Sequence, residues 1–508
     1  MSLTNDTTNL FQSDAQHERA ETRRLKTKLH KRSGFPITLK SKPLRVIVRH
    51  HPDKEADAWV AESGFVVRKL GLETGKTKQT YKGHLGPVTS IDFYHTPPRA
   101  APGASADVKG KSRELLVSGS WDKSIRVWDT RTNHLLSTTV AHVDFVKAVH
   151  VIPMLKVVVS GSSDRDLRFW DLSRFDTFDW QNFQRTNKPA NSEEIVDSQP
   201  STGAAPPSAV ANSPLDALLV LKGHTRPIEK LTSYAIQSRA INPDVDSETE
   251  PSGRIALLSV DSLGALKTWE LWRDETGTLR GKLRNEVRNH EIGIYDISVG
   301  DGEIWTASAD NSALMSSFDA SNIALPSSPR VRLVQPHGVK SLLSMSIAAP
   351  FLNSSHVLLG SSDESIYVID TSVSELDPAS STALPSWPAS SVTVTGNGNS
   401  NEKRIAGLVS VIDGHAHEVT DIHVFLGPKD ISDNDDTKDG ISPTVVLKRD
   451  TVWILSASVD GTLRRWKWSD VLAGTTSRAL VENKQQEKDE NLMTAEEEAE
   501  LEALMADD

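Results

Sequence analysis

Sixteen histidines and no cysteine make histidine the residue of this 508-residue chain best equipped for chemistry. Five of them stand four residues before an aliphatic residue, in the pairs His84–Val88, His142–Val146, His224–Ile228, His290–Ile294 and His415–Val419. A histidine can ligate a metal, or it can lie in a protein core with both ring nitrogens hydrogen-bonded. The residues around each histidine decide between these roles.

A serine, an aspartate and a tryptophan follow three of these histidines, spaced four and then six residues apart. A buried Trp needs an acceptor for its indole N–H, and an aspartate at a tight turn can accept from a buried histidine. A serine hydroxyl can bridge the two rings, so the four side chains would satisfy one another. The pattern therefore predicts three structural tetrads: His84/Ser118/Asp122/Trp128, His142/Ser160/Asp164/Trp170 and His415/Ser456/Asp460/Trp466.

Other chemistry finds little support in the residue pattern. The pairs His50–His51 and His415–His417 lack the spacing of a third zinc ligand. The absence of cysteine removes disulfides, thiol catalysis and cysteine zinc sites. The sequence holds no phosphate-binding loop, no nucleophile elbow and no zinc-protease motif. We expect no catalytic residue, no metal, no cofactor and no enzymatic activity.

Short β-rich runs separated by tight turns carry these residues, which is typical of antiparallel hairpins. The clearest copies are Leu116–Asp129, Val158–Asp171 and Ile454–Lys467. One such repeat cannot bury its own apolar face, so several must pack side by side around an axis.

The repeats resemble the WD-repeat family, through the Gly-His pairs Gly83–His84, Gly223–His224 and Gly414–His415 and the Trp-Asp pairs Trp128–Asp129 and Trp170–Asp171. The resemblance covers about Pro36 to Asp470 and implies an all-β fold, a single propeller of four-stranded blades. We count seven blades: a degenerate one over Arg45–Leu72, and six that begin at His84, His142, His224, His290, His337 and His415. The run Pro36–Lys42 can supply the strand missing after Trp466 and so close the ring.

Three blades depart from the tetrad pattern. The blade at His224 has Ser259 and Trp269, but Leu263 where the aspartate is expected. The blade at His290 has Thr306 and Asp310, then Ser316 in place of Trp. The blade at His337 keeps Asp363, but has Leu359 and Ile369 in the Ser and Trp places and its aliphatic residue, Leu342, comes late. Full tetrads are thus expected in three blades.

Six long insertions are expected to fall on one face of the propeller. They separate the first strand from the second, or the third from the fourth, and they are rich in Ser, Pro, Asn and Asp, which favours disordered loops. They are Thr96–Arg113, Phe175–Pro214, Ala240–Gly253, Arg273–Val287, Thr371–Arg404 and Gly427–Arg449. The opposite face keeps short connections, so it offers a compact surface on which a peptide or partner helix could dock.

Candidate contacts on that face precede the turn aspartates (Trp121, Ser163 and Val459) or follow the Gly-His pairs (Phe145 and Arg226). Trp and Arg are enriched at binding hot spots. Each also has a structural alternative: Trp121 and Phe145 can pack between blades, and Arg226 can be a solvated surface charge.

The two ends of the chain carry opposite charge. Residues 481–508 contain 11 acidic and 2 basic residues, while seven basic residues and one acidic residue lie between Arg19 and Arg32. In the tail, Thr494–Glu497 forms a capping box, and Leu501, Leu504 and Met505 recur at helical spacing. The tail is either a partner-binding helix or a solubilising segment. The basic arm is a nuclear localisation signal, an RNA-contacting arm or a solvated helix.

The expected organisation is a disordered basic arm over 1–35, a propeller over 36–470 with disordered insertions near 97–113, 175–214, 240–253, 371–404 and 427–449, and an acidic tail with a short helix over 471–508. No apolar run reaches the roughly 18 residues needed to span a bilayer, and Met1–Asp14 lacks the apolar stretch of a secretory signal. We therefore expect an intracellular protein, in the cytoplasm or the nucleus, without a membrane partner.

The function that this pattern favours is a non-enzymatic scaffold or adaptor that binds other proteins in a complex. One alternative is a substrate receptor of a cullin ubiquitin ligase, because Leu116–Arg131 resembles the box by which some WD-repeat proteins bind the damaged-DNA-binding adaptor, with Arg131 as the contact residue. Another is an RNA- or ribosome-assembly factor that uses the basic arm, the only part suited to nucleic acid.

Overall fold

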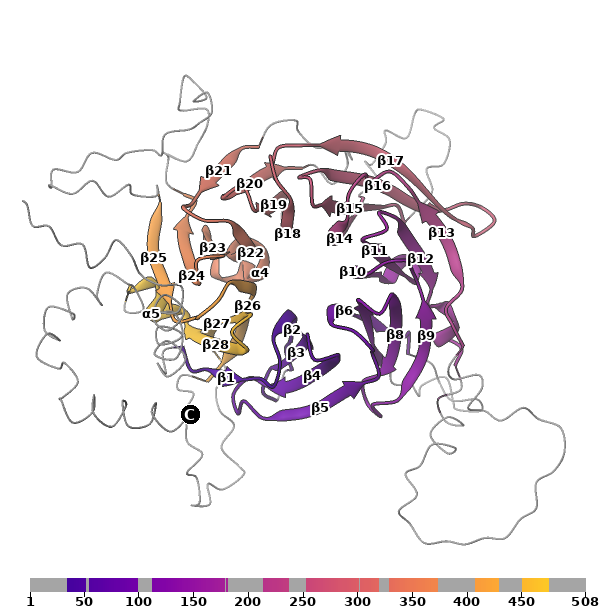
Figure 1. Cartoon of the computed structure of the whole chain (residues 1–508), viewed down its shortest axis with the longest axis horizontal. Coiled ribbons are helices and arrows are strands. Elements are labelled where there is room, and N and C mark those ends of the chain that lie inside the picture. Colours follow the sequence, from indigo (N-terminus) through magenta and orange to yellow (C-terminus); the bar gives the residue numbers. More distant parts are fainter. Residues whose placement is uncertain are drawn as a thin grey trace, which may run out of the picture.

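The chain folds into seven four-stranded antiparallel sheets arranged as blades around a central axis (Figure 1). This computed structural model describes residues 34–51, 54–98, 112–178, 180, 213–236, 253–300, 302–318, 329–372, 407–428 and 450–474. The predicted basic arm, most of the insertions and the acidic tail, with Leu501, Leu504 and Met505, lie outside these residues. The prediction of a seven-bladed propeller is confirmed.

Each blade runs from an inner strand at the axis to an outer strand at the rim. The inner strands, in the order of the blades, are β2 (Pro43–Arg49), β6 (Val88–His95), β10 (Val146–Ile152), β14 (Ile228–Ala235), β18 (Ile294–Gly300), β22 (Val339–Ser344) and β26 (Val419–Gly427). The second strands are β3 (Asp57–Glu62), β7 (Glu114–Ser120), β11 (Val157–Ser162), β15 (Ile255–Asp261), β19 (Glu303–Ser308), β23 (His356–Ser361) and β27 (Thr451–Ser458).

The third strands are β4 (Val66–Gly71), β8 (Ser124–Asp129), β12 (Leu167–Asp171), β16 (Leu266–Arg273), β20 (Ser312–Ser317), β24 (Ser365–Asp370) and β28 (Thr462–Lys467). The outer strands are β5 (Thr77–Lys82), β9 (Leu135–Val140), β13 (Ala217–Leu221), β17 (Leu279–Val287), β21 (Val331–Val334), β25 (Leu408–Asp413) and β1 (Ile37–Thr38). Short helices lie in the connections: η1 (Pro153–Leu155), η2 (Ser173–Phe175), α4 (Met345–Ala348), η3 (Pro350–Leu352) and α5 (Trp468–Leu472).

The N-terminal strand closes the ring, as the sequence predicts. Ile37 pairs with Leu463 and Thr38 with Thr462, so β1 is the outer strand of blade seven. The paired stretch is only two residues long, although the backbone N–H of Arg465 also donates to the carbonyl oxygen of Gly34 (2.6 Å). Closure leaves no blade without a neighbour on either side.

The hydrophobic core lies between neighbouring blades. One buried cluster joins Leu115 and Val117 of blade two to Val146 and Val158 of blade three. The approach is close because a Cβ on Gly119 would lie 2.8 Å from Val146, which explains why a glycine stands between the two serines of that strand. A blade by itself would leave these faces in water, so the repeats stabilise one another.

Polar side chains also connect successive blades. The hydroxyl of Ser90 accepts from the backbone N–H of Val149 (3.0 Å), and the carboxylate of Asp421 accepts from the N–H of Val46 (2.8 Å). These bonds occupy inner-strand donors that would otherwise be buried without a partner.

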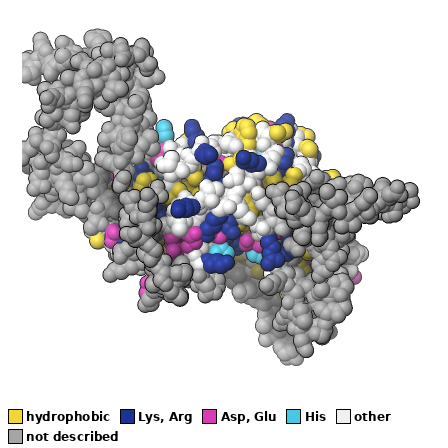
Figure 2. Space-filling model, turned by 90° about the horizontal axis from the view of Figure 1, so that it is seen from below, with side chains coloured by type: hydrophobic (Ala, Val, Ile, Leu, Met, Phe, Trp, Pro, Cys, Tyr) yellow, Lys and Arg dark blue, Asp and Glu magenta, His cyan; other side chains and the backbone are white. Residues whose placement is uncertain are grey.

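The edge of the disc seen in Figure 2, on the side where Figure 1 places β4 and β5, carries Lys and Arg side chains beside Asp and Glu side chains. Lys78 in β5 shows how these charges pair, because its ammonium group lies 2.6 Å from Asp57 and 2.8 Å from Glu55. This part of the rim is therefore mixed in charge.

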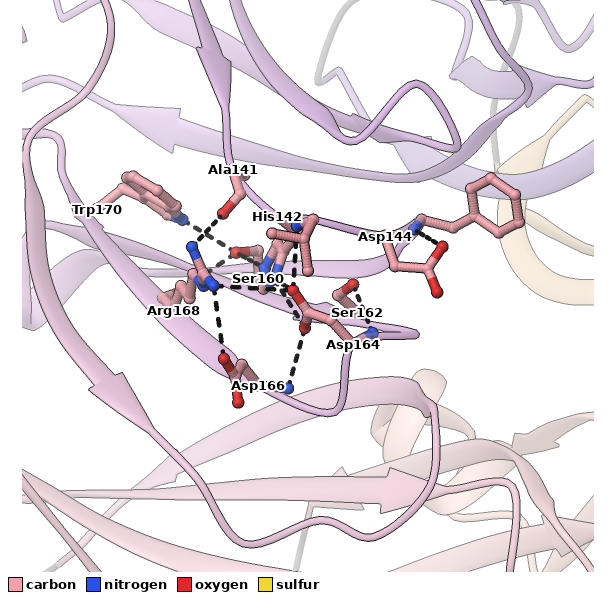
Figure 3. A network of polar contacts seen from close by, with 11 residues as sticks. Ala141, His142, Asp144, Ser160, Ser162, Asp164, Asp166, Arg168 and Trp170 are labelled. Atoms are coloured by element: carbon pink, nitrogen blue, oxygen red, sulfur yellow. Dashed lines mark hydrogen bonds and ion pairs between the residues drawn. The ribbon is translucent and has the colours of Figure 1, made fainter.

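The tetrad side chains form one continuous hydrogen-bond chain, seen for blade three in Figure 3. The indole N–H of Trp170 donates to the Ser160 hydroxyl oxygen (2.9 Å), and this hydroxyl lies 2.7 Å from Nε2 of His142. Nδ1 of His142 lies 2.9 Å from Asp164. Because Trp can only donate and a carboxylate can only accept, the serine hydroxyl and the histidine ring connect a donor at one end of the chain to an acceptor at the other. Blades two and seven have the same contacts, between His84, Ser118, Asp122 and Trp128, and between His415, Ser456, Asp460 and Trp466.

Blade four has a full tetrad that the sequence spacing did not predict. His224 contacts Ser259 (2.7 Å) and Asp261 (2.9 Å), and the indole N–H of Trp269 donates to Ser259 (2.8 Å). The aspartate stands at the end of β15, two residues earlier than expected, and Leu263 is in the turn. The prediction of only three full tetrads is therefore wrong. Blade five has a partial network in which His290 contacts Thr306 (2.8 Å) and Asp310 (2.9 Å).

Blade six begins two residues before the predicted histidine. Val339 pairs with Ser361 as Val88 pairs with Ser120 in blade two, so the place of His84 falls to Gln335. Gln335 is buried, whereas His337 is exposed. The carboxylate of Asp363 accepts from the hydroxyl of Tyr367 (2.6 Å) instead of from a histidine.

The predicted insertion Arg273–Val287 is also wrong. Residues 279–287 form β17, which pairs with β16 over its whole length and leaves a turn of five residues between them. Polar residues at alternate positions made this exposed outer strand look like a loop. Conversely, the 13 residues between β20 and β21 form a longer connection that the sequence pattern did not indicate.

Replacing the shared hydroxyl tests how much a tetrad stabilises the fold. Ser160→Ala leaves the Trp170 indole N–H and the His142 Nε2 buried without their common partner, at a cost of about 1–3 kcal/mol for each group. We expect the free energy of unfolding to fall by about 2–5 kcal/mol in denaturant titrations, against less than about 0.5 kcal/mol for Ser163→Ala in the turn after β11, which is outside the tetrad. Equal effects of the two substitutions would contradict the role given to the tetrad.

The tetrads also predict how stability depends on pH. Burial opposes ionisation of Asp310, but hydrogen bonds and charge from His290, with a bond from Ser312, outweigh it and lower the pKa of Asp310 to about 2. A pKa lowered on folding gives stability that is present above the unfolded value of 3.8 and lost as the pH falls towards 2. The pKa of His84 is lowered below 6.5, chiefly by burial, so protonation acts in the same direction at milder acidity.

We therefore expect the melting temperature to fall continuously as the pH drops below about 6.5, most steeply between about 4 and 2. Asp310→Asn should be less stable than the wild type at pH 7 and show a shallower loss in the acid range. A wild-type melting temperature that is constant from pH 7 to pH 3, measured by calorimetry, would contradict this account.

Candidate protein-binding site

The two faces of the disc differ in the length of their connections. We call compact face the side made by connections from an outer strand to the next inner strand and from a second strand to a third, none of which exceeds six residues. We call fringed face the opposite side, which carries the remaining connections. Those of more than ten residues all lie there: 96–113, 172–216, 236–254, 318–330, 345–355, 371–407 and 428–450.

Trp121 and Phe145 form an exposed aromatic pair on the compact face. Their rings stack with centroids 5.3 Å apart and an angle of 23° between the planes. Trp121 is 43% exposed and Phe145 is 41% exposed, so neither is buried between the blades. The pair joins the turn of blade two that follows β7 to the connection that enters blade three before β10. Stacked aromatic rings at a surface are typical of binding hot spots.

The tetrad aspartates accept hydrogen bonds from the backbone of residues beside this aromatic pair. The carboxylate of Asp122 accepts from the backbone N–H of Leu85 (2.9 Å), while that of Asp164 accepts from the N–H of Val143 (3.3 Å). The backbone N–H of Ser163 donates to the carbonyl oxygen of Phe145 (3.0 Å). Each turn is thus connected to the loop beside it, which preorganises the surface.

Two aliphatic residues that sequence reasoning did not single out complete this surface. Leu85 is 82% exposed and Val143 is 72% exposed, each directly after the histidine of its tetrad. We call Leu85, Trp121, Val143 and Phe145 the apolar arc. An aliphatic residue directly after a buried histidine, in a loop too short to fold back, was the signal that could have identified them.

The remaining candidates are spread over the molecule. Arg226 is exposed on the compact face, at the entrance to blade four, while Ser163 and Val459 are half-buried in their turns. Arg131 is exposed on the fringed face, where its backbone N–H donates to Asp129 (3.1 Å). The structure brings together Trp121 and Phe145 but places Arg131 on the other side of the disc.

A cavity of about 430 Å³ opens at the axis, lined by the inner strands and by Trp121. Three of its cations form ion pairs with acids: Arg45 with Asp421 (3.2 Å), Lys147 with Glu229 (2.6 Å) and Lys230 with Asp296 (2.6 Å). Burial, with the nearby charge of Arg45, lowers the pKa of Lys230 against the opposing effect of the two aspartates. The paired charges leave little net attraction for an ion.

In the part of the chain that the structure describes, no group of three His, Cys, Asp or Glu side chains could hold a metal ion. The tetrad histidines are buried, and both ring nitrogens are hydrogen-bonded, as His142 shows. None of the helices within the described ranges is long and apolar enough to cross a membrane.

Comparison with known proteins agrees with this architecture. The WD domain, G-beta repeat family matches residues 75–129 and 133–171, which contain β5 to β8 and β9 to β12. An uncharacterized WD repeat-containing protein of Schizosaccharomyces pombe is 32% identical over 147 residues, which make up 28% of this chain and 36% of that protein. The periodic tryptophan protein 2 homolog of the same organism is 33% identical over 69 residues, 14% of this chain and 6% of the relative.

The chain thus spans about a third of the length of the first relative and much less of the second. The matched repeats include blades two and three, which contribute Trp121 and Phe145 to the stacked pair. The chain thus carries matched WD repeats over residues 75–129 and 133–171 and folds into a ring of seven four-stranded sheets, and in both respects it is similar to WD-repeat β-propeller proteins.

Proposed function

We propose that this protein is a non-enzymatic scaffold or adaptor that binds a partner protein through the compact face, in a complex with other proteins. The observation that carries this proposal is the stacked and exposed pair Trp121–Phe145, in which Trp121 also lines the axial cavity. Propellers of this family generally act in protein interactions rather than in catalysis.

Three features support the compact face over the rest of the surface. Its connections are short, so a partner meets a surface that needs little ordering on binding. Its apolar arc has exposed members in two neighbouring blades, joined by the Trp121–Phe145 stack, whereas isolated apolar residues are ordinary on any protein surface. Its turns are fixed by buried hydrogen bonds to Asp122 and Asp164.

Truncating the aromatic pair tests the proposal. The double variant Trp121→Ala/Phe145→Ala should lose at least one protein that co-purifies with the wild type in quantitative affinity purification, since hot-spot truncation costs about 2 kcal/mol or more, about 30-fold in affinity. The matched control is Phe351→Ala in η3, which removes a 63% exposed aromatic ring from the fringed face.

Both variants should melt close to the wild type, because the side chains removed are exposed. The proposal is contradicted by a double variant that melts like the wild type and retains every partner. Loss of the same partners from Phe351→Ala would instead assign their binding to the fringed face.

The cullin-receptor alternative has one observation in its favour, the exposure of Arg131 beside the turn that Asp129 stabilises. If Arg131 contacts the adaptor, Arg131→Ala should abolish co-purification of that adaptor while leaving the partners of the compact face. An unchanged set of partners would rule this alternative out. The RNA alternative rests on residues 19–32, which lie outside the described ranges, and no described residue favours it.

A further inference from the structure

The surface of blades two and three repeats one combination of side chains. In blade two the exposed Leu85 follows the tetrad histidine and the exposed Lys123 follows the turn aspartate. In blade three Val143 and Arg165 occupy the same two places, and both are exposed. An apolar side chain and a cation therefore recur side by side, one blade apart.

The tetrad aspartates set this spacing. Asp122 accepts from the N–H of Leu85, and Lys123 is the next residue in the chain after Asp122. In blade three, Asp164 accepts from the N–H of Val143, and Arg165 is the next residue in the chain after Asp164. The Trp121–Phe145 stack joins the two blades, with Trp121 two residues before Lys123 and Phe145 two residues after Val143.

Other blades do not repeat the combination. The two places hold Glu291 and Asn311 in blade five, Pro336 and Glu364 in blade six, and Ala416 and Gly461 in blade seven. The combination is thus not a requirement of the repeat, because the blade forms without it. Blade four adds exposed cations at Lys222 and Arg226, on the side next to blade three.

These cations have no acidic partner in the described structure. Within those ranges, no ion pair forms at Lys123, Arg165, Lys222 or Arg226, which contrasts with the paired cations of the axial cavity. The turn aspartates of both blades are engaged by their histidines. Asp144, half-buried, accepts from the backbone N–H of Phe145 (2.8 Å), and Asp166, half-buried next to Arg165, lies 3.5 Å from Arg168. The apolar arc is therefore flanked by cations that form no ion pair within the described ranges.

We propose that the apolar arc and the cations Lys123 and Arg165 bind an acidic segment of a partner protein, with an aliphatic or aromatic side chain between its carboxylates. The inference rests on the proposed function and adds the chemistry of the partner. The apolar side chain packs against Trp121 and Phe145, and the carboxylates face Lys123 on one side and Arg165 on the other. Such electrostatic complementarity gives specificity for the matching partner and increases the association rate.

A protein segment fits this surface better than a nucleic acid. Leu85 and Val143 offer aliphatic area that a phosphate backbone would not cover, and the two cations are separated by apolar groups instead of forming a continuous track. A nucleic acid is nonetheless a distinct outcome of the test.

The test selects random peptides displayed on phage against the full-length protein and then measures affinity by fluorescence polarisation. The enriched peptides should carry net negative charge and at least one large apolar residue. Their affinity should fall about tenfold or more for Lys123→Glu/Arg165→Glu, with a smaller dependence on salt. Glutamate suits these turns, because Glu364 occupies the same place in blade six with φ 76°, beside 70° at Lys123 and 74° at Arg165.

The matched control is Lys54→Glu/Lys282→Glu, which reverses two exposed charges away from the compact face and should leave the affinity unchanged. Basic or uncharged peptides that lose binding on Trp121→Ala would overturn the inference while keeping the proposed function. Peptides that bind Trp121→Ala as well as the wild type, or no enrichment over beads, would contradict both. Binding of a mixed-sequence RNA that Lys123→Glu/Arg165→Glu abolishes, with peptide binding unaffected, would reassign the surface to nucleic acid.

Discussion

The hydrogen-bond chain from tryptophan through serine and histidine to aspartate is the interaction on which the compact face of this propeller depends. It lies inside a blade, yet its last member, the aspartate, is at the compact face. In blade three the carboxylate of Asp164 accepts from the ring of His142 and from the backbone N–H of Val143. One buried network therefore determines both the packing within the blade and the position of the residues that the compact face exposes. Each of the four side chains has a hydrogen-bond partner within this chain, so burying them together costs little.

Blades without the network are held by other means. Blade one has a buried ion pair, in which Arg68 donates to Glu62 (2.5 Å), and blade six has the contact from Tyr367 to Asp363. Both still form four strands, because packing against neighbouring blades supplies most of the apolar burial. The network is thus dispensable for making a blade in a closed ring. Its presence in blades two and three matters for the surface, where it aligns two turns beside the Trp121–Phe145 pair.

The repeat pattern was sufficient to predict the seven blades and the closing N-terminal strand, since both follow from counting apolar runs and tight turns. The pattern gave a wrong prediction where a residue occupies a tetrad place from a different position in the sequence. Asp261 reaches His224 from the end of a strand, two residues before the turn position that the spacing indicated. Gln335 takes the histidine place in blade six, so no histidine marks where that blade begins. The strand β17 was missed because its side chains are mostly exposed, which makes its composition loop-like.

Only part of the candidate site could be predicted from the sequence. Trp121 and Phe145 could be named from their places in the repeat, but whether they pack between blades or face outward depends on the neighbouring turn. Leu85 and Val143 were missed because an aliphatic residue in a strand-rich chain is normally assigned to the core. Their exposure follows from the short loop and from the aspartate that holds its backbone, neither of which residue type alone reveals.

The central claim, that the compact face is the partner-binding surface, is tested most directly by covalent capture. A photo-reactive benzoylphenylalanine is placed at Phe145 or, as the matched position on the fringed face, at Phe351, and cells that express each protein are irradiated. Mass spectrometry of the purified adducts should identify a partner protein cross-linked at position 145 and absent from position 351. Cross-links that form only at position 351, or no protein adduct at position 145 in a complex that still co-purifies, would contradict the account.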